Sequence, residues 1–246
     1  MPLYPDEVRE LDVSKIRDIS GEVLDAEGRL RILPAAYWAS VSKDERALFA
    51  NRHGYYSLPT VELVEHLREV IGKETAVEIG AGSGILAAEL GIRATDRKQQ
   101  EDKRFADTYG TTGGRMPPAP YGPNVETCTG NRAARLYRPD VMLACWVTHR
   151  YNRARHAAGG NAVGIDEEDL LRHVGRYVFV GNELVHKDKS IWSLPHTIDF
   201  PPWLYSRAVN KSRNFIAIWP GSRKQVAKPT NVRAPRPGAK PLRRKR

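Results

Sequence analysis

Residues 76–96 constrain the fold of this chain more than any other segment. An apolar stretch at 76–79 runs into a Gly-Ala-Gly-Ser-Gly loop at 80–84, then into a helix-forming stretch, and then into a short apolar stretch that ends on Asp96. Glycines permit positive φ and a close approach of the backbone to a ligand, and the free N–H groups at a helix start attract polar or anionic groups. An acid at the end of the second strand can accept hydrogen bonds from ribose hydroxyls. The segment predicts a βαβ unit that binds a nucleoside-containing cofactor.

The spacing of the glycines distinguishes two classes of cofactor. A dinucleotide fingerprint, G-x-G-x-x-G, needs its third glycine at position 85, where this chain has Ile85. The chain instead has Glu78 two residues before three alternating glycines, Gly80, Gly82 and Gly84. This pattern resembles the first motif of the class I S-adenosylmethionine (SAM)-dependent methyltransferases. It disfavours an NAD-dependent oxidoreductase, and the simpler alternative is a glycine-rich turn in another α/β protein.

A second element carries the same resemblance. Residues 54–60, Gly-Tyr-Tyr-Ser-Leu-Pro-Thr, precede a periodic apolar helix and look like the Tyr/Pro/Thr element that stands before the first motif in many such enzymes. The resemblance implies a Rossmann-like three-layer α/β/α sandwich with SAM as its cofactor, and its specific part is 55–96. By this resemblance the residues that bind the cofactor are Tyr56, Thr60, Glu78, Gly80, Ala81, Gly82, Gly84, Asp96 and Trp146. Trp146 has a second interpretation, as a core tryptophan.

The domain organisation follows from composition and charge. We expect a helical or irregular lead at 1–54, a methyltransferase-like domain at 55–221 and a basic tail at 222–246. The charged and then Gly/Pro-rich segment 97–123 interrupts the domain, either as a substrate-facing loop or as surface decoration. Six strands are predicted, with 190–194 as the candidate seventh: 75–79, 92–96, 125–128, 140–147, 176–180 and 214–219.

The sequence departs from the family after its third strand. Many members place an acid there for the adenine amino group, whereas this chain has Thr-Cys-Thr-Gly-Asn at 127–131 and keeps Glu126 inside the strand. We therefore expect adenine recognition through backbone groups or through Asn131.

The acceptor side lacks a familiar signature. The loop after strand 140–147 has neither the Asp/Asn-Pro-Pro-aromatic motif of amino methyltransferases nor a Pro-Cys nucleophile, and Cys145 is interpreted as a packing residue. His149 in that loop is the candidate general base, and the alternative is a loop histidine bonded to the backbone. Three polar residues after strand 176–180 are candidate substrate contacts: Asn182, Glu183 and His186.

The net charge of +10 is confined to the tail. Residues 222–246 hold ten Lys or Arg and no acid, so the remaining 29 basic residues balance the 29 acidic ones. With several prolines and little to bury, the tail is expected to be disordered alone. DNA or RNA is one expected partner of the tail through its phosphate backbone, and a protein assembly is the other.

Other classes are not favoured by the sequence. No apolar run is long enough to span a bilayer and no secretory signal is visible, so no membrane partner and a cytoplasmic location are expected. The two cysteines do not have a metal-ligand spacing. Two hypotheses remain: a SAM-dependent methyltransferase acting on nucleic acid, or a non-catalytic, SAM-binding or vestigial module in a nucleoprotein or viral assembly.

Overall fold

A seven-stranded sheet organises the computed structural model, which describes residues 13–102, 117, 120–208 and 210–223. The spatial order of the strands is β4-β3-β2-β5-β6-β9-β7. The first five are parallel, while β9 runs antiparallel between β6 and β7. The strands are β2 (Ala76–Ile79), β3 (Arg93–Asp96), β4 (Val125–Thr127), β5 (Val141–Cys145), β6 (Arg176–Asn182), β7 (Thr197–Asp199) and β9 (Asn214–Pro220).

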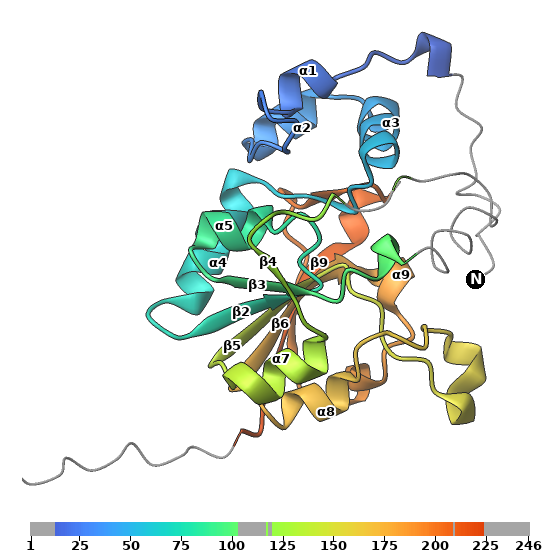
Figure 1. Cartoon of the computed structure of the whole chain (residues 1–246). Helices are drawn as coiled ribbons and strands as arrows, with labels where there is room; N and C mark the ends of the chain where they lie inside the picture. The colour runs from blue at the N-terminus through green and yellow to red at the C-terminus, as the bar shows by residue number, and fades with distance from the viewer. Residues whose placement is uncertain (1–12, 103–116, 118–119, 209, 224–246) are drawn as a thin grey trace, which may run out of the picture.

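Helices cover both faces of the sheet, as β5 illustrates. Val141 and Leu143 point to one face, where they pack with α4 (Val61–Ile71) and α5 (Ile85–Leu90). Met142 and Ala144 point to the other, toward α7 (Gly130–Tyr137) and α8 (Glu167–Leu171). Because both faces of a central parallel strand are buried, its sequence is continuously apolar. The predicted α/β/α sandwich is confirmed, and Figure 1 shows the helices on the two sides of the sheet.

The seventh strand is not where the sequence predicted it. Residues Ser190–Ser193 form a 3-10 helix, η5, and the strand is β7, which starts at Thr197. The apolar Ile191-Trp192 pair resembled a strand because Ile191 is fully buried against the core. The actual edge strand is only three residues long, with Ile198 as its one apolar residue, so its sequence shows no apolar alternation. Its pairing with β9 completes the antiparallel pair expected of the family.

The described part of the lead, residues 13–54, contains three α-helices that pack around Trp38 and Phe49. They are α1 (Ser20–Val23), α2 (Ala35–Ser40) and α3 (Lys43–His53), drawn in blue above the sheet in Figure 1. Ser42 and Glu45 form a capping box that starts α3. Their apolar cluster also includes Tyr55, Leu58 and Tyr205. The last two belong to a small sheet in which β1 (Ser57–Leu58) pairs with β8 (Tyr205–Ser206), so the helices are joined to the large domain.

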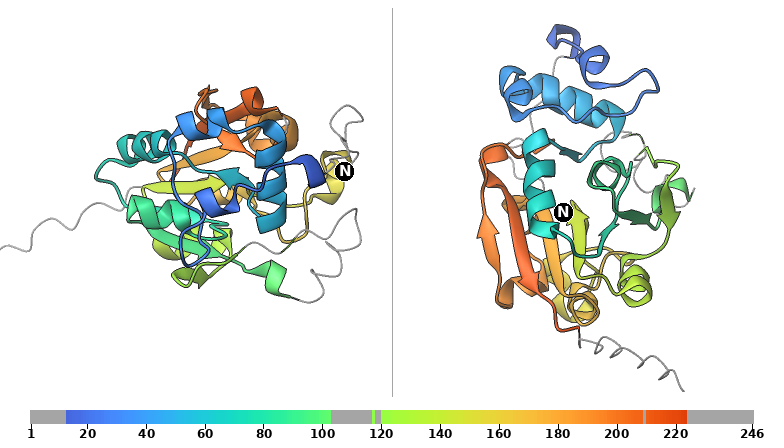
Figure 2. Two further views of the ribbon diagram at one scale, coloured as in Figure 1. Left: turned by 90° about the horizontal axis from the view of Figure 1, so that it is seen from above. Right: turned by 90° about the vertical axis from the view of Figure 1, so that its left-hand side faces the viewer.

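The remaining short elements connect these layers. They are η2 (Val13–Lys15), η3 (Gln99–Glu101), η4 (Arg153–Ala158), α9 (Glu183–His186) and η6 (Lys211–Arg213). The right-hand view of Figure 2 shows the lead at one end of the sheet, and the left-hand view looks down on it from that end.

The start of the tail is attached to the domain. The Ser222 N–H donates to the Leu171 carbonyl over 2.8 Å, and Arg223 forms an ion pair with Asp140. Residues 224–246, on which the tail predictions rest, lie outside the described residues, as does the greater part of the 97–123 segment. Within the described ranges, every helix is too short or too polar to cross a lipid bilayer.

Candidate functional site

A cavity of about 1020 Å³ lies at the carboxyl edge of the parallel strands. In an open α/β sheet, ligands bind in the crevice outside this edge. Nine of the candidate cofactor and substrate residues line it. One directly precedes β1, and the others come from β2, β3, β5, β6 and the segments that follow them: Tyr56, Glu78, Gly80, Ala81, Gly82, Asp96, Trp146, Asn182 and His186.

The glycines of the loop serve different purposes. At Gly80, where φ is +60°, a Cβ atom would lie 2.4 Å from Cγ1 of Val147. At Gly84 a Cβ atom would lie 2.6 Å from Cγ2 of Val125, so this glycine lets α5 pack on β4 and does not line the cavity. Gly82 has no atom within 4 Å of its Cβ position and lies on the cavity wall. Gly82 is therefore the glycine that leaves space for a ligand.

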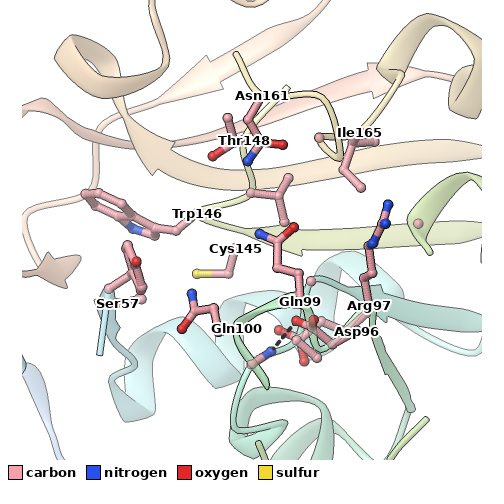
Figure 3. Close-up of a pocket in the computed structure, with 18 of the residues that line it drawn as sticks. Ser57, Asp96, Arg97, Gln99, Gln100, Cys145, Trp146, Thr148, Asn161 and Ile165 are labelled. Atoms are coloured by element: carbon pink, nitrogen blue, oxygen red, sulfur yellow. Dashed lines mark hydrogen bonds between the residues drawn. The ribbon is translucent and has the colours of Figure 1, made fainter. Parts of the chain in front are cut away.

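Asp96 holds the glycine loop in position. Its Oδ2 accepts from the Gly82 N–H over 3.0 Å and its Oδ1 from the Lys98 N–H over 2.7 Å; Figure 3 shows the carboxylate on the cavity wall. Burial raises the pKa of Asp96, and the two backbone donors oppose that shift. Each carboxylate oxygen has a second lone pair, so the side chain can accept from a ligand hydroxyl while it fixes the loop.

Glu78 lies deeper in the same wall. Only 2% of it is exposed, and its Oε2 accepts from the Ala87 N–H, in the first turn of α5, over 3.0 Å. Burial raises its pKa to about 8, with a smaller contribution from Asp96. A cation bound beside this carboxyl would favour its ionised form and lower that pKa.

Trp146 follows β5 in a strained conformation. Its φ is +60°, which is a sterically unfavourable backbone angle for a bulky residue. Its N–H donates to the Val180 carbonyl over 2.9 Å, and its ring meets His186 edge-on at 5.3 Å. The strained turn places the indole in the cavity wall (Figure 3). Strain of this kind clusters at functional sites.

Thr60 does not line the cavity. Its hydroxyl accepts from the Leu63 N–H over 3.1 Å, which caps α4, and donates to the Trp203 carbonyl over 3.2 Å. The same residue types, Ser and Thr, serve as helix caps and as ligand contacts, and in the structure Thr60 is a helix cap. Ser57 and Pro59 contribute to the wall in its place.

His149 faces away from the large cavity. Its Nε2 lies 3.1 Å from the Ala158 carbonyl, and its side chain lines a separate cavity of about 400 Å³. Burial lowers its pKa, so the ring is neutral at pH 7. The alternative of a loop histidine bonded to the backbone matches this geometry, and the position disfavours a general-base role. Its neighbours Thr148 and Arg150 line the large cavity.

The three candidate substrate residues separate into two groups. Asn182 is buried and bonded to Asn214, 2.9 Å away, and Nδ1 of His186 accepts from the Asn182 N–H over 3.0 Å. Nδ1 of His186 also lies 3.1 Å from the Asn182 carbonyl oxygen. Burial holds the pKa of His186 well below its usual value, so its ring is neutral. Glu183 does not line the cavity and pairs with Arg213 instead.

Asn131 lies in the wall but its amide is already used. It accepts from the Asp166 N–H over 3.0 Å and donates to the Asp166 carbonyl over 2.7 Å and to Asp169 over 2.8 Å. These bonds attach α7 to the start of α8 and leave the amide little capacity for adenine. Cys145 also lines the cavity, and burial raises the pKa of its thiol to about 12, so it is no thiolate nucleophile at neutral pH.

Several wall residues were not identified from the sequence. Figure 3 shows Arg97, Gln99 and Gln100 next to Asp96, at the start of the 97–123 segment, which was expected to be a substrate-facing loop or surface decoration. Their position one to four residues beyond the acid at the end of β3 is the one signal that could have identified them. Tyr121, from the far end of the 97–123 segment, lies in the same region, and its hydroxyl accepts from the Gln100 N–H over 3.4 Å.

Comparison with known proteins gives only distant likenesses. No protein-family model and no curated protein matches the chain. Among solved structures, a proposed SAM-dependent methyltransferase from Streptococcus mutans is 12% identical with a TM-score of 0.31, covering 63% of this chain, and this chain spans 46% of that protein. A proposed RNA methyltransferase from Pyrococcus horikoshii is 11% identical with a TM-score of 0.33, covering 74% and 98% of the two chains.

Likenesses this weak say nothing about function. The chain's own topology is more informative, because the seven-stranded sheet ends in an antiparallel pair and the glycine loop and Asp96 lie at its carboxyl edge. These features give the chain the class I methyltransferase fold.

Proposed function

We propose that this protein is a SAM-dependent methyltransferase. The observation that carries the proposal is the arrangement of Asp96, Gly82 and Glu78 along one wall of a single cavity. Asp96 suits the ribose hydroxyls of the cofactor, and the open Gly82 backbone suits close contact with its nucleoside. Glu78, a buried acid in the same wall, suits the positively charged methionine end.

The size of the cavity supports a reaction of two substrates. Sites for single small molecules occupy roughly 300–1,000 Å³, and this cavity of about 1020 Å³ is at the upper end of that range. The Asp96 side would hold the cofactor, and the side formed by Trp146, Thr148 and Asn182 would face the methyl acceptor.

Methyl transfer from SAM needs few catalytic groups from the protein. SAM supplies an activated methyl group on a sulfonium, which transfers by in-line displacement, so the main contribution of the chain is to position donor and acceptor. Trp146 and His186 would shape the acceptor side, where His186 contributes a neutral imidazole ring. His149 has no part in this scheme, because its ring is directed to the other cavity.

Nucleic acid is the acceptor class we favour. Supporting it, five arginines line the cavity, and the basic tail adds a further source of phosphate affinity. The arginines are Arg97, Arg132, Arg135, Arg150 and Arg207.

A non-catalytic SAM-binding module is the second candidate. The observation that favours it is the acceptor side itself, where His149 is turned away and Asn182 is committed to Asn214.

A transfer experiment separates the two candidates. The purified protein is incubated with methyl-labelled SAM and, separately, with total RNA, single-stranded DNA, duplex DNA and a protein extract. Label in a nucleic acid fraction that disappears in Asp96→Asn supports the proposed function. Binding of SAM with no transfer to any fraction would favour the non-catalytic module, and label in the protein fraction alone would contradict the choice of acceptor.

A further inference from the structure

Residues 148–165 form an arm that continues from the wall of the large cavity. It leaves the sheet after β5 and returns at the start of α8, and Figure 1 shows it in yellow, projecting at the right. Its base, including Thr148, Arg150 and Asn161, lines the cavity. Any ligand held along the arm therefore lies next to the proposed acceptor side.

The base of the arm is fixed by backbone bonds. Arg150 N–H donates to the Ile165 carbonyl over 2.8 Å, and Tyr151 N–H donates to the Asn161 carbonyl over 2.8 Å. The two sides of the arm approach so closely that a Cβ atom at Gly164 would lie 2.2 Å from the His149 carbonyl oxygen. The His149 ring braces the turn through Ala158. The arm is thus a built element with a defined position.

The exposed part of the arm is basic and carries an aromatic ring. Residues 148–165 contain three arginines, two histidines and no acid. Arg150, Arg153 and Arg155 are exposed, and none of them has an ion pair with a carboxylate in the described part of the chain. Tyr151 is 38% exposed, and its hydroxyl is bonded to Nδ1 of His156 over 2.8 Å.

The acids that follow the arm do not neutralise it. Asp166 caps α8 by accepting from the Asp169 N–H over 3.1 Å. Glu167 is buried against Lys189 at 2.7 Å, and Asp169 pairs with Arg135 at 2.6 Å. Glu168 is exposed and lines the smaller cavity together with the three arginines, but it forms no ion pair with them in the described part of the chain. The arginines of the arm therefore keep their charge available for a partner.

We propose that this arm binds the sugar–phosphate backbone of a single-stranded nucleic acid and guides one of its nucleotides into the large cavity. Guanidinium groups interleaved with an exposed aromatic ring are the combination that binds single strands, through phosphate contacts and base stacking. The inference deepens the proposed function, on which its second half rests. It places acceptor binding on the arm, whose first residues form the loop that the sequence analysis treats as the acceptor side, and this surface is separate from the tail.

The test uses the full-length protein and fluorescently labelled 20-nucleotide single strands of RNA and DNA. Fluorescence anisotropy is measured from 50 to 300 mM salt for the wild type, Arg153→Glu and Arg155→Glu. The control is Lys73→Glu, which reverses one exposed charge in the loop before β2, at the opposite edge of the sheet. All four proteins keep the tail, so its contribution to strand binding is the same in each of them.

We expect each arm variant to weaken binding on the order of tenfold at 100 mM salt, and the slope of log K against log salt to fall by about 0.7 for each phosphate that the variant no longer binds. The affinity of Lys73→Glu for the strands should stay within about twofold of that of the wild type. Tyr151→Ala should weaken binding, and Tyr151→Phe should restore it, because stacking does not need the hydroxyl.

SAM affinity, measured in parallel by calorimetry, separates this inference from the proposed function. Unchanged SAM binding in arm variants that no longer bind strands supports both. If the wild type fails to bind SAM while the arm variants still lose strand binding, the proposed function fails and the backbone-binding half of the inference stands. Arm variants that bind strands as the Lys73→Glu control does would overturn the inference. So would arm variants that lose affinity for an acidic peptide such as poly-glutamate but keep their affinity for the strands.

Discussion

The two walls of the large cavity are built in different ways. The cofactor wall, residues 78–84 and 96–100, is a contiguous βαβ unit held by its own backbone, with Asp96 bonded to two N–H groups within 14 residues of it. The acceptor wall, residues 145–148, 161–165 and 184–186, is assembled from strand ends and loops that buried side chains hold together, such as Lys189 donating to the Val147 carbonyl over 3.1 Å. A wall made by local sequence can be recognised from that sequence, whereas a wall made by tertiary contacts cannot.

The largest loss of unfolding free energy is expected from a buried ion pair behind the acceptor wall. Lys189 and Glu167 form a buried ion pair at 2.7 Å, and the Tyr177 hydroxyl donates to the same carboxylate oxygen over 2.9 Å. Lys189→Met leaves the carboxylate buried without its partner, which should cost about 3–5 kcal/mol of unfolding free energy. Urea denaturation measures it. The double variant Lys189→Met/Glu167→Gln should recover more than half of the loss, and an equal loss in the double variant would show that the pair is not the source.

Substitutions that strain the backbone of the cofactor wall should lower the stability of the protein. Gly80→Ala combines a positive φ with a methyl group 2.4 Å from Val147, so we expect a loss of about 2–4 kcal/mol of unfolding free energy. Gly82→Ala, with the same type of φ and no neighbour within 4 Å, should cost only about 1–2 kcal/mol. The same denaturation experiment measures both. Equal losses would contradict the separate functions assigned to these glycines.

The pH dependence of stability tests the burial of Glu78. Its pKa is about 8 in the fold against an ordinary value of 4.5, so the folded state binds this proton more tightly than the unfolded state. The stabilisation is full below pH 4.5 and is lost as the pH rises through about 8. In the wild type the unfolding free energy should fall by roughly 2–4 kcal/mol across that window, and in Glu78→Gln this fall should be absent. Denaturation from pH 5 to 8.5 measures it, and parallel profiles for variant and wild type would disprove the assignment.

The smallest change in unfolding free energy is expected for a substitution of His149. Its ring braces the arm through Ala158, so His149→Ala should change global stability by only about 1 kcal/mol while loosening the arm. Limited trypsin digestion should then cut after Arg153 and Arg155 a few times faster than in the wild type. Unchanged cleavage at these two sites would remove the bracing role and reopen the question of what the histidine does.

The sequence predicted the cofactor wall well because its signals are local. An acid, alternating glycines and a strand that ends on Asp96 describe a backbone path, and the structure follows it. The predicted strands at 75–79 and 92–96 agree with β2 and β3 to within one residue. Binding by these residues stays a prediction until a ligand is tested.

The rest was not predictable because side-chain direction and tertiary partners decide it. His149 follows the end of β5, where the methyl group of the cofactor is expected. Its ring nevertheless points to the other cavity, because residues 149–150 pair with residues 161 and 165 across the arm. Glu183 pairs with Arg213, 30 residues away, which no local pattern indicates. Thr60 caps α4 through the Leu63 N–H, and a Thr before a helix fits a cap as well as a ligand contact. The edge strand β7 was missed because its three residues show no apolar alternation.

The most direct test of the central claim is calorimetric titration of the full chain with SAM, S-adenosylhomocysteine and NAD. The variants are Asp96→Asn and, as control, Asp199→Asn on the exposed edge strand β7. We predict micromolar binding of the first two ligands and none of NAD. We also predict a loss of about 10- to 100-fold in Asp96→Asn, the order of magnitude of a hydrogen bond to a charged group, and no change in Asp199→Asn. Absence of binding to SAM and S-adenosylhomocysteine, or equal affinity in both variants, would contradict the assignment of this cavity as a SAM site.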